Sequence, residues 1–447
     1  MIFNSVPAAG DPPLSAESLI DDTPVGTGQY ALFVLCCCVS MVEGFDLQAM
    51  AFAAPDIAQE WHVASALFGL VFSAGLFGGL AGGFLVGAVG FSFGPKTTLV
   101  FSLLLFGTFT TTTVFGTTLG QLGILRCIAG IGLGAAVPGV VSIVASYFPR
   151  RVRSLAVTLV VSCQLLGAVV GGAISASLVN AHGWRAIFVL GGVTPLFLVP
   201  LLAWWLPESL GYLDRQRNGA ERIRGILVRF GKVARESASR ITVRRNESHK
   251  AAVVELLNCG RAFPTLLLWT TCIVGAALLY FLVNWLPSIL RNAGASQSLS
   301  IIGSVVLNAG GLSGAIVLSR LMDKVSSFIP IIAGYAISAF FILIVSRDAS
   351  VTPLELTMIY LVGFFGLGAQ SCITALIVKL YPHDLHSAGV GCALGFARIG
   401  AVLGPLVGSY ILEAGGSARD LFYFAALAAI CAALSTLSMS RSNAVRA

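Results

Sequence analysis

Long apolar runs separated by short polar stretches form the main pattern of this chain. A helix needs about 20 mostly apolar residues to cross a bilayer, and twelve runs meet that requirement. They lie at about 28–52, 65–88, 97–117, 120–145, 154–179, 184–206, 263–290, 299–320, 327–346, 354–378, 388–412 and 421–439. The pattern predicts an all-α membrane protein with twelve transmembrane helices.

A single long polar segment, 207–262, divides these runs into two sets of six. An internal repeat supports the division, because "FPRRVRSLA" at 148–156 aligns with "YPHDLHSAG" at 381–389, and "GAVVGG" at 167–172 aligns with "GAVLGP" at 400–405. We therefore expect two pseudo-symmetric six-helix bundles. The predicted units are an N-terminal tail (1–27), an N-terminal bundle (28–206), a linker (207–262), a C-terminal bundle (263–440) and a C-terminal tail (441–447).

The basic residues gather on one side of this predicted topology. With the N-terminus in the cytoplasm, the inner loops and tails hold 21 of the 27 Lys and Arg residues, and the outer loops hold four. Positive residues favour the cytoplasmic side, so we expect both termini there and the chain in the cell inner (plasma) membrane. The net charge of +7 then requires no nucleic-acid partner. The basic linker is interpreted as a solvated segment on anionic lipid headgroups, with a regulatory or partner-binding role as the alternative.

Composition agrees with a membrane protein and argues against an enzyme. The chain is 56% hydrophobic and only 11% charged, against about 25% charged in soluble domains. Its ten cysteines lie in or beside apolar runs and show no metal-ligand spacing, so we interpret them as packing residues. No nucleophile–base pair, metal set or phosphate loop appears, and we expect neither a metal nor a cofactor.

Four charged residues lie inside the predicted helices and away from their ends, where charge is costly and usually functional. Glu43 and Asp46 are three residues apart and so share one face of the first helix. Arg126 lies in the fourth helix and Arg398 in the eleventh. One hypothesis gives proton coupling to the two carboxyl groups and anion binding to the two guanidinium groups. The alternative is a permanent salt bridge that only holds helices together.

Several segments carry a family resemblance. The most specific is "EGFDLQAMAFAAP" (43–55), supported by "RCIAGIGLGAAVPG" (126–139), "LPESLGYL" (206–213) and "GFARIGAVLGPLVG" (395–408). With these segments the chain resembles the major facilitator superfamily, and within it the aromatic acid:proton symporters that import 4-hydroxybenzoate and protocatechuate. The resemblance implies alternating access, a small aromatic acid and protons as cargo, and a carrier that works as a monomer.

A gating motif between the second and third helices is only partly present. The superfamily usually has G-x-x-x-D-R-x-G-R-K, and this chain has "GAVGFSFGPK" (87–96). Gly87, Gly94 and Lys96 match the motif, and Asp323 and Lys324 match it in the second half. The resemblance implies that these five residues latch the gate.

The remaining substrate contacts are predicted from position. Gln164 lies one residue short of the repeat position of Arg398, and Tyr280 and Asn284 share a face of the seventh helix with Trp285 beside it. An aromatic ring and an amide suit a hydroxylated benzoate, although aromatic residues at this spacing often only pack.

The sequence thus predicts a proton-coupled importer of an aromatic carboxylate. A transporter of another organic acid, a drug exporter that works by proton antiport, and a non-transporting sensor of aromatic acids remain as alternatives.

Overall fold

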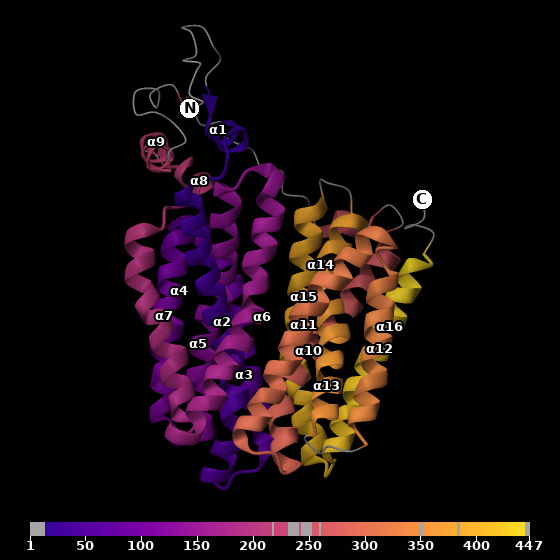
Figure 1. The fold of residues 1–447 in the computed structure, drawn as a ribbon. Helices are drawn as coiled ribbons and strands as arrows, with labels where there is room; N and C mark the ends of the chain where they lie inside the picture. Colours follow the sequence, from indigo (N-terminus) through magenta and orange to yellow (C-terminus); the bar gives the residue numbers. More distant parts are fainter. Residues whose placement is uncertain are drawn as a thin grey trace.

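The protein, described from a computed structural model, is an assembly of long helices in two groups (Figure 1). The structure describes residues 14–216, 219–230, 241–242, 253–258, 261–347, 352–381 and 385–442. Much of the predicted linker and of both predicted tails therefore lies outside the described residues. Within them, the only strands are Leu14–Ser15 (β1) and Ile241–Thr242 (β2), which form a short parallel pair.

The N-terminal bundle contains the first six long helices. They are α2 (Thr27–Glu60), α3 (Phe68–Phe93), α4 (Pro95–Thr112), α5 (Leu119–Tyr147), α6 (Arg150–His182) and α7 (Arg185–Trp205). Short 3₁₀ turns, η1 (Ser65–Leu67) and η2 (Thr113–Phe115), adjoin α3 and α4. Three short helices precede α2 or follow α7: α1 (Ala16–Asp22), α8 (Leu210–Leu213) and α9 (Gly219–Arg229).

The C-terminal bundle repeats the plan. Its helices are α10 (Ala262–Asn292), α11 (Gln297–Lys324), α12 (Ile329–Val345), α13 (Pro353–Val362), α14 (Gly368–Leu380), α15 (His386–Glu413) and α16 (Ala418–Ser440), and the 3₁₀ turn η4 (Val253–Leu256) precedes them. The helices α13 and α14 form one rod through a π-helical turn, η5 (Gly363–Leu367).

The apolar runs behave as the sequence predicts. Eleven described helices are long and apolar enough to cross a membrane, and α12 is a shorter apolar helix. The all-α membrane fold with two six-helix bundles is thus confirmed. Several helix ends differ from the predicted spans by a few residues. The largest difference is at the first span, which was expected to end at about residue 52, whereas α2 continues through Pro55 to Glu60. Polar residues end the apolar run there, although the helix itself continues.

Close packing at glycine shows the pseudo-symmetry of the two bundles. A Cβ atom at Gly167 of α6 would overlap the carbonyl oxygen of Met41 in α2, and one at Gly400 of α15 would overlap that of Ile273 in α10. Gly167 and Gly400 are aligned positions of the sequence repeat. Small residues let helix backbones approach closely in membranes, so the same glycine holds the same helix pair together in each half.

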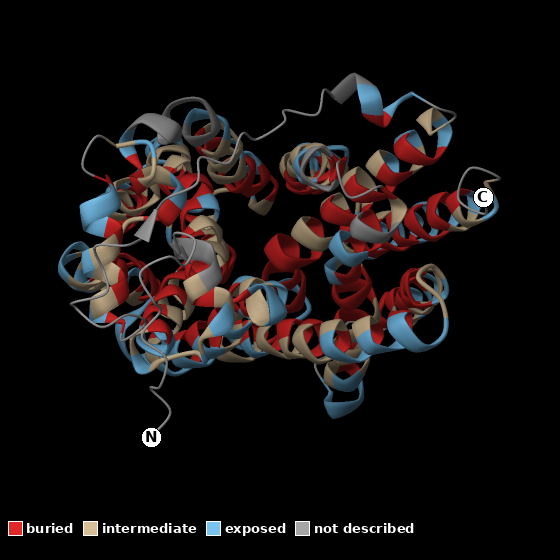
Figure 2. Cartoon of the chain, turned by 90° about the horizontal axis from the view of Figure 1, so that it is seen from above, coloured by how far each residue is buried: buried red, intermediate tan, exposed pale blue. Residues whose placement is uncertain are grey.

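Both described ends of the chain and α8 and α9 lie at one end of the molecule, called here the terminal side; the opposite end is the far side (Figure 1). Figure 2 shows the two groups of helices from the terminal side, with exposed residues mainly at the periphery.

Hydrogen bonds between the bundles lie in the far half of the molecule. The described residues form seven of them, joining Gln48–Asn308, Phe52–Gln297, Gln59–Arg291, Ala66–Ser409, Ser73–Val402, Gly79–Arg398 and Ala176–Ser298. The Gly79–Arg398 bond is the one nearest the terminal side, close to the middle of α3 and α15. The bundles are therefore fastened from mid-depth to the far side.

Candidate functional site

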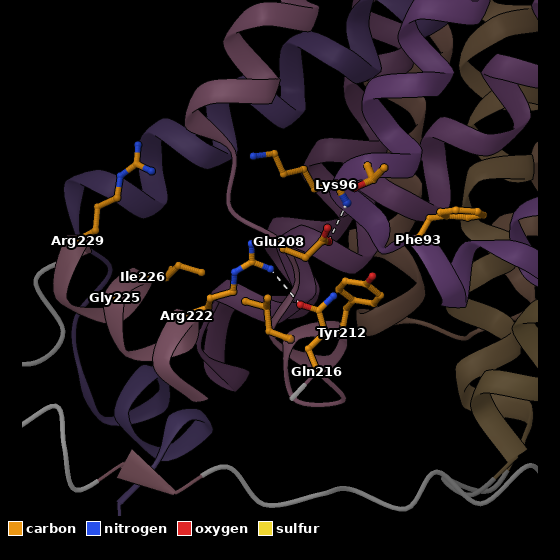
Figure 3. Close-up of a pocket in the computed structure, with 11 residues that line it drawn as sticks. Phe93, Lys96, Glu208, Tyr212, Gln216, Arg222, Gly225, Ile226 and Arg229 are labelled. Carbon is orange, nitrogen blue, oxygen red and sulfur yellow. Dashed lines mark hydrogen bonds between the residues drawn. The ribbon is translucent and has the colours of Figure 1, made fainter. Parts of the chain in front are cut away.

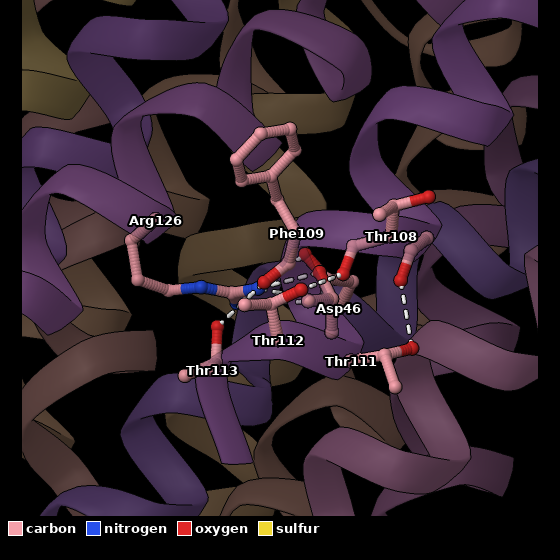
Figure 4. Close-up of polar contacts among 9 residues, drawn as sticks. Asp46, Thr108, Phe109, Thr111, Thr112, Thr113 and Arg126 are labelled. Carbon is pink, nitrogen blue, oxygen red and sulfur yellow. Dashed lines mark hydrogen bonds and ion pairs between the residues drawn. The ribbon is translucent and has the colours of Figure 1, made fainter. Parts of the chain in front are cut away.

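A buried ion pair joins three helices of the N-terminal bundle (Figure 4). Nη2 of Arg126 in α5 lies 3.3 Å from Oδ1 of Asp46 in α2, and the two side chains are 5% and 0% exposed. Thr110 of α4 connects them, because its hydroxyl donates to Asp46 Oδ1 at 2.9 Å and accepts from Arg126 Nη2 at 2.6 Å. Burying a pair of charges is favourable only when hydrogen bonds satisfy the remaining polar atoms, and Thr110 supplies such bonds.

The ion pair has one unsatisfied donor and reaches the boundary between the bundles. Within the described part of the chain, Nε of Arg126 has no hydrogen-bond partner. The ring of Phe188 lies 5.3 Å from the Arg126 guanidinium carbon. Asp46 and Arg126 line a cavity of about 30 Å³ together with Asn284 from the opposite bundle. Since one water needs roughly 10–15 Å³ on this scale, the cavity has room for water and not for an aromatic ring.

Glu43 lies about one turn from Asp46 toward the terminal side and belongs to a different cluster. It is buried, and the side chain of Gln164 in α6 lies close enough to act on its carboxyl group. Arg398 lies close enough to act electrostatically on both Glu43 and Tyr280 of α10. Among the described residues nothing bonds to Glu43 Oε2. Buried polar atoms without a partner are rare, and each one calls for an explanation such as a proton or a bound water.

Arg398 extends from the C-terminal bundle toward the N-terminal one. Its Nη1 donates to the carbonyl oxygen of Gly79 in α3. Its guanidinium also lies against Gly83, where a Cβ would be 3.4 Å from the central carbon. The side chain is partly exposed, and no described carboxylate lies within 4.0 Å of it. Its position beside Gly79 marks the terminal-side limit of the contact between the bundles.

The three predicted contacts on α10 have different environments. Asn284 lines the small cavity and donates to the backbone oxygen of Tyr280 at 2.7 Å. Tyr280 lies with Glu43 and Arg398. Trp285 is fully buried: it donates to the Pro405 carbonyl at 3.1 Å and packs edge-on against the ring of Phe72. Consecutive helical residues point about 100° apart, so Trp285 does not share the helix face of Asn284. Its side chain packs between the bundles instead.

The predicted gating residues fall on the terminal side. Gly94 adopts a positive φ of 86° before α4. The Lys96 amide donates to Glu208 Oε1 at 2.9 Å, and its ammonium donates to the Ala203 carbonyl at 2.7 Å. A Cβ at Gly94 would lie 2.6 Å from Glu208 Oε2, so both the turn and the carboxylate require glycine.

The other predicted gating residues do not join this contact. Gly87 lies within α3, and Asp323 and Lys324 are the exposed last two residues of α11. The structure therefore brings together Gly94 and Lys96, through Glu208.

Sequence reasoning missed Thr110 and Glu208. Thr110 belongs to the run "TFTTTT" (108–113), whose hydroxyls are unusual in an apolar helix, and that run was the available signal. Glu208 lies in "LPESLGYL", which was used only as a mark of family. Its contact with the Lys96 amide depends on how the segment after α7 packs against the start of α4, which is not encoded locally.

Comparison with known proteins gives one consistent result. The family model of the Major Facilitator Superfamily matches residues 36–389. A gallate transporter of Pseudomonas putida is 33% identical over 96% of this chain and 95% of its own length. A 4-hydroxybenzoate transporter, PcaK of Acinetobacter baylyi, is 34% identical over 89% of this chain and 88% of its own length.

A solved structure gives the same fold. The xylose transporter XylE of E. coli, determined in a partially occluded inward-open conformation, matches with a TM-score of 0.73 at 16% identity. The match covers 92% of this chain and 99% of that one. At this identity the likeness concerns the fold alone.

Proposed function

Because this chain belongs to the major facilitator superfamily, among its aromatic acid transporters and not among enzymes, we propose that it imports a benzoate-type carboxylate together with a proton. The relatives named for gallate and 4-hydroxybenzoate support a hydroxylated benzoate as the substrate class. The Asp46–Arg126 pair is the observation that carries the proposal, because it places a protonatable group and an anion receptor within one buried contact.

The pair couples the two cargoes by competition. A proton on Asp46 removes its negative charge, and Arg126 then lacks the anion that a buried guanidinium needs. Once the bundles part and widen the cavity of about 30 Å³ beside the pair, the carboxylate of the substrate takes that place, using the guanidinium and its unsatisfied Nε donor. When the substrate leaves, Asp46 loses its proton and closes the pair again. Net charge at the site is thus conserved through the cycle, which lets the loaded and empty carriers both change state.

The second cluster holds the substrate on its way to the cytoplasm. Arg398 offers a second guanidinium, with Gln164, Tyr280 and Asn284 as polar and aromatic contacts. Glu43 acts as a second proton site, which its unpaired oxygen supports. Trp285 contributes by packing Phe72 against the boundary between the bundles.

The orientation follows from the distribution of basic residues. With the terminal side in the cytoplasm of a plasma membrane, the bundles are fastened on the outer half and the state is inward-facing. For outward opening the seven bonds between the bundles break and new contacts form on the terminal side. Gly87, Gly94, Lys96, Asp323 and Lys324 act there as the gate. One chain holds both clusters, which supports action as a monomer.

The available driving force is sufficient for accumulation. One proton imported with one monocarboxylate moves no net charge, so the membrane potential contributes only if a second proton, on Glu43, crosses as well; it then adds about 2.3 kcal/mol per 100 mV. Each unit of pH difference contributes about 1.4 kcal/mol per proton. One pH unit therefore supports about tenfold accumulation of the acid by the one-proton cycle.

A vesicle experiment tests this function on the unmodified protein. Vesicles without an energy source receive 4-hydroxybenzoate outside while the external pH is recorded. Symport predicts that the outside becomes more alkaline, with a slower or absent response to an aliphatic acid. An acidified or unchanged outside in vesicles that take up labelled substrate would contradict symport. Specific binding without any uptake or exchange would instead favour a sensor.

A further inference from the structure

A polar pocket opens on the terminal side of the N-terminal bundle (Figure 3). No residue of either charge cluster lines it. It has a volume of about 490 Å³ and lies among the start of α4, the segment after α7, and the helices α8 and α9. The proposed transport cycle uses one of its lining residues, Lys96, in the gate and gives the pocket itself no role.

Positive charge predominates in the polar pocket. Lys96, Arg222 and Arg229 line it, and Glu208 is its one acidic residue. Glu208 is already engaged by the backbone amides of Lys96 and Ser209, at 2.9 and 3.0 Å. No described carboxylate lies within 4.0 Å of a charged nitrogen of the three cations. The pocket therefore has two positive charges in excess, which suit an anion.

The two arginines are held at the pocket by α9. They are seven residues apart and so share one face of that helix. Arg222 donates to Gln216 Oε1 at 3.0 Å, and Arg229 lies 5.1 Å from the ring of Trp205. The opposite face of α9 buries Ile223 and Leu227 in the core of the bundle. The helix is thus fixed with its guanidinium groups toward the pocket.

An apolar groove continues from the polar pocket along the membrane-spanning helices. This groove has a volume of about 400 Å³, and its walls come from α3, α4 and α5. Leu85, Phe101 and Ile131 are among its lining residues, and it presents almost no polar surface. Phe93 and Thr97 line both the groove and the polar pocket. One elongated ligand could therefore occupy both.

The junction lies at the level of the membrane surface. Trp204 and Trp205 end α7 beside the pocket, and residue Trp204 is 90% exposed. Tryptophan is enriched where acyl chains meet headgroups. The polar pocket therefore lies at headgroup depth, and the groove lies at acyl-chain depth.

We propose that the pocket and groove together bind one phospholipid with an anionic headgroup. Its phosphate and headgroup contact Arg222, Arg229 and Lys96, and one acyl chain lies in the groove between α3 and α5. A free phosphate would satisfy the cations alone, but it would leave the continuous apolar groove uncovered. The bound lipid would tie α9 to the start of α4, beside the Lys96–Glu208 contact.

Native mass spectrometry of the purified full chain tests the proposal without any variant. The chain is mixed with equal amounts of phosphatidylglycerol and phosphatidylcholine, first without and then with an excess of glycerol 1-phosphate as competitor. We expect phosphatidylglycerol to remain bound in preference by about tenfold or more, and glycerol 1-phosphate not to compete. Equal retention of phosphatidylcholine, or displacement by glycerol 1-phosphate, would overturn the proposal.

Two variants locate the site. Arg222→Gln with Arg229→Gln should weaken phosphatidylglycerol binding by about thirtyfold, since each basic residue at a headgroup contributes roughly fivefold. Leu105→Trp, which fills the groove, should weaken binding while leaving the cations in place.

Arg320→Gln is the matched control. It removes a charge from an exposed residue of α11, outside the pocket, and should leave binding unchanged. A loss per removed charge that is the same in the control and in the double variant would reduce the effect to net charge. Undiminished binding in both test variants would place the lipid elsewhere.

Discussion

The two bundles share a helical plan but differ in the charges they hold at mid-depth. Gly167 and Gly400 pack equivalent helix pairs in the same way. The N-terminal bundle adds two buried carboxyl groups, Glu43 and Asp46, and pairs one of them with Arg126. The C-terminal bundle has Arg398 at this depth, without a described carboxylate within ion-pair distance. Duplication preserved the packing, while the chemistry became concentrated in one half.

This difference separates structural from functional requirements. A contact that occurs in both bundles serves the fold, whereas a contact found in one bundle is a candidate for function. By this criterion the Asp46–Thr110–Arg126 contact and the Glu43 cluster are the functional candidates. The following changes test the distinction, beginning with the largest expected effect.

Removing the cation of the buried pair should have the largest effect on stability. Arg126→Gln leaves Asp46 buried without its partner, which costs about 3–5 kcal/mol of unfolding free energy and should abolish uptake. The measurement is thermal unfolding of the purified protein in detergent. Combining the change with Asp46→Asn removes both charges and should recover most of the stability. If Arg126→Gln alone were as stable as the wild type, Asp46 and Arg126 would not be energetically coupled.

Enlarging the symmetric glycines should have an intermediate effect, equal in the two bundles. Gly167→Ala and Gly400→Ala each force a methyl group against a backbone carbonyl, which costs about 1–3 kcal/mol. Gly395→Ala is the control within α15, because its added Cβ meets nothing within 4 Å. Unequal losses at Gly167 and Gly400 would break the proposed symmetry of packing.

Neutralising the arginine of the C-terminal bundle should affect binding more than stability. Arg398→Gln loses the charged bond to Gly79, worth about 1.5–3 kcal/mol, and leaves no described carboxylate within ion-pair distance unpaired. We expect KM for the aromatic acid to rise about tenfold, with a smaller rise for Arg398→Lys, which keeps the charge. Thermal unfolding measures the stability, and initial uptake rates measure KM. A loss of stability as large as that of Arg126→Gln would remove the contrast between the bundles.

The surface ion pair of the N-terminal bundle should have the smallest effect. Glu60 and Arg185 lie 2.9 Å apart with side chains 44% and 45% exposed. Exposed pairs contribute about 0–1 kcal/mol, so Glu60→Gln should change stability by no more than that and uptake by less than twofold. A large loss of uptake would mean that acidic residues of α2 contribute to transport whether or not they are buried.

Much of the fold was predictable from the sequence because the bilayer imposes a simple length requirement on apolar runs. The repeat was also visible, since Gly167 and Gly400 align. The buried charges could be identified because carboxyl groups are rare in such runs. Helix ends were harder to predict: α2 continues beyond its apolar run to Glu60.

The choice of partners was not predictable. Either Arg126 or Arg398 could have paired with Asp46, and only the arrangement of α2, α4 and α5 selects Arg126. The role of Glu208 likewise depends on a contact between residues more than 100 positions apart. The direction in which the Trp285 side chain points likewise depends on how the two bundles pack against each other.

The central claim is that Asp46 carries the proton that drives uptake. Proteoliposomes with Asp46→Asn, and with Glu60→Gln as the matched acid-to-amide control on the same helix, receive labelled 4-hydroxybenzoate under an inward proton gradient. We expect Asp46→Asn to lose accumulation but to keep exchange of internal for external substrate, while Glu60→Gln accumulates normally. Accumulation by Asp46→Asn at the wild-type level would contradict the account.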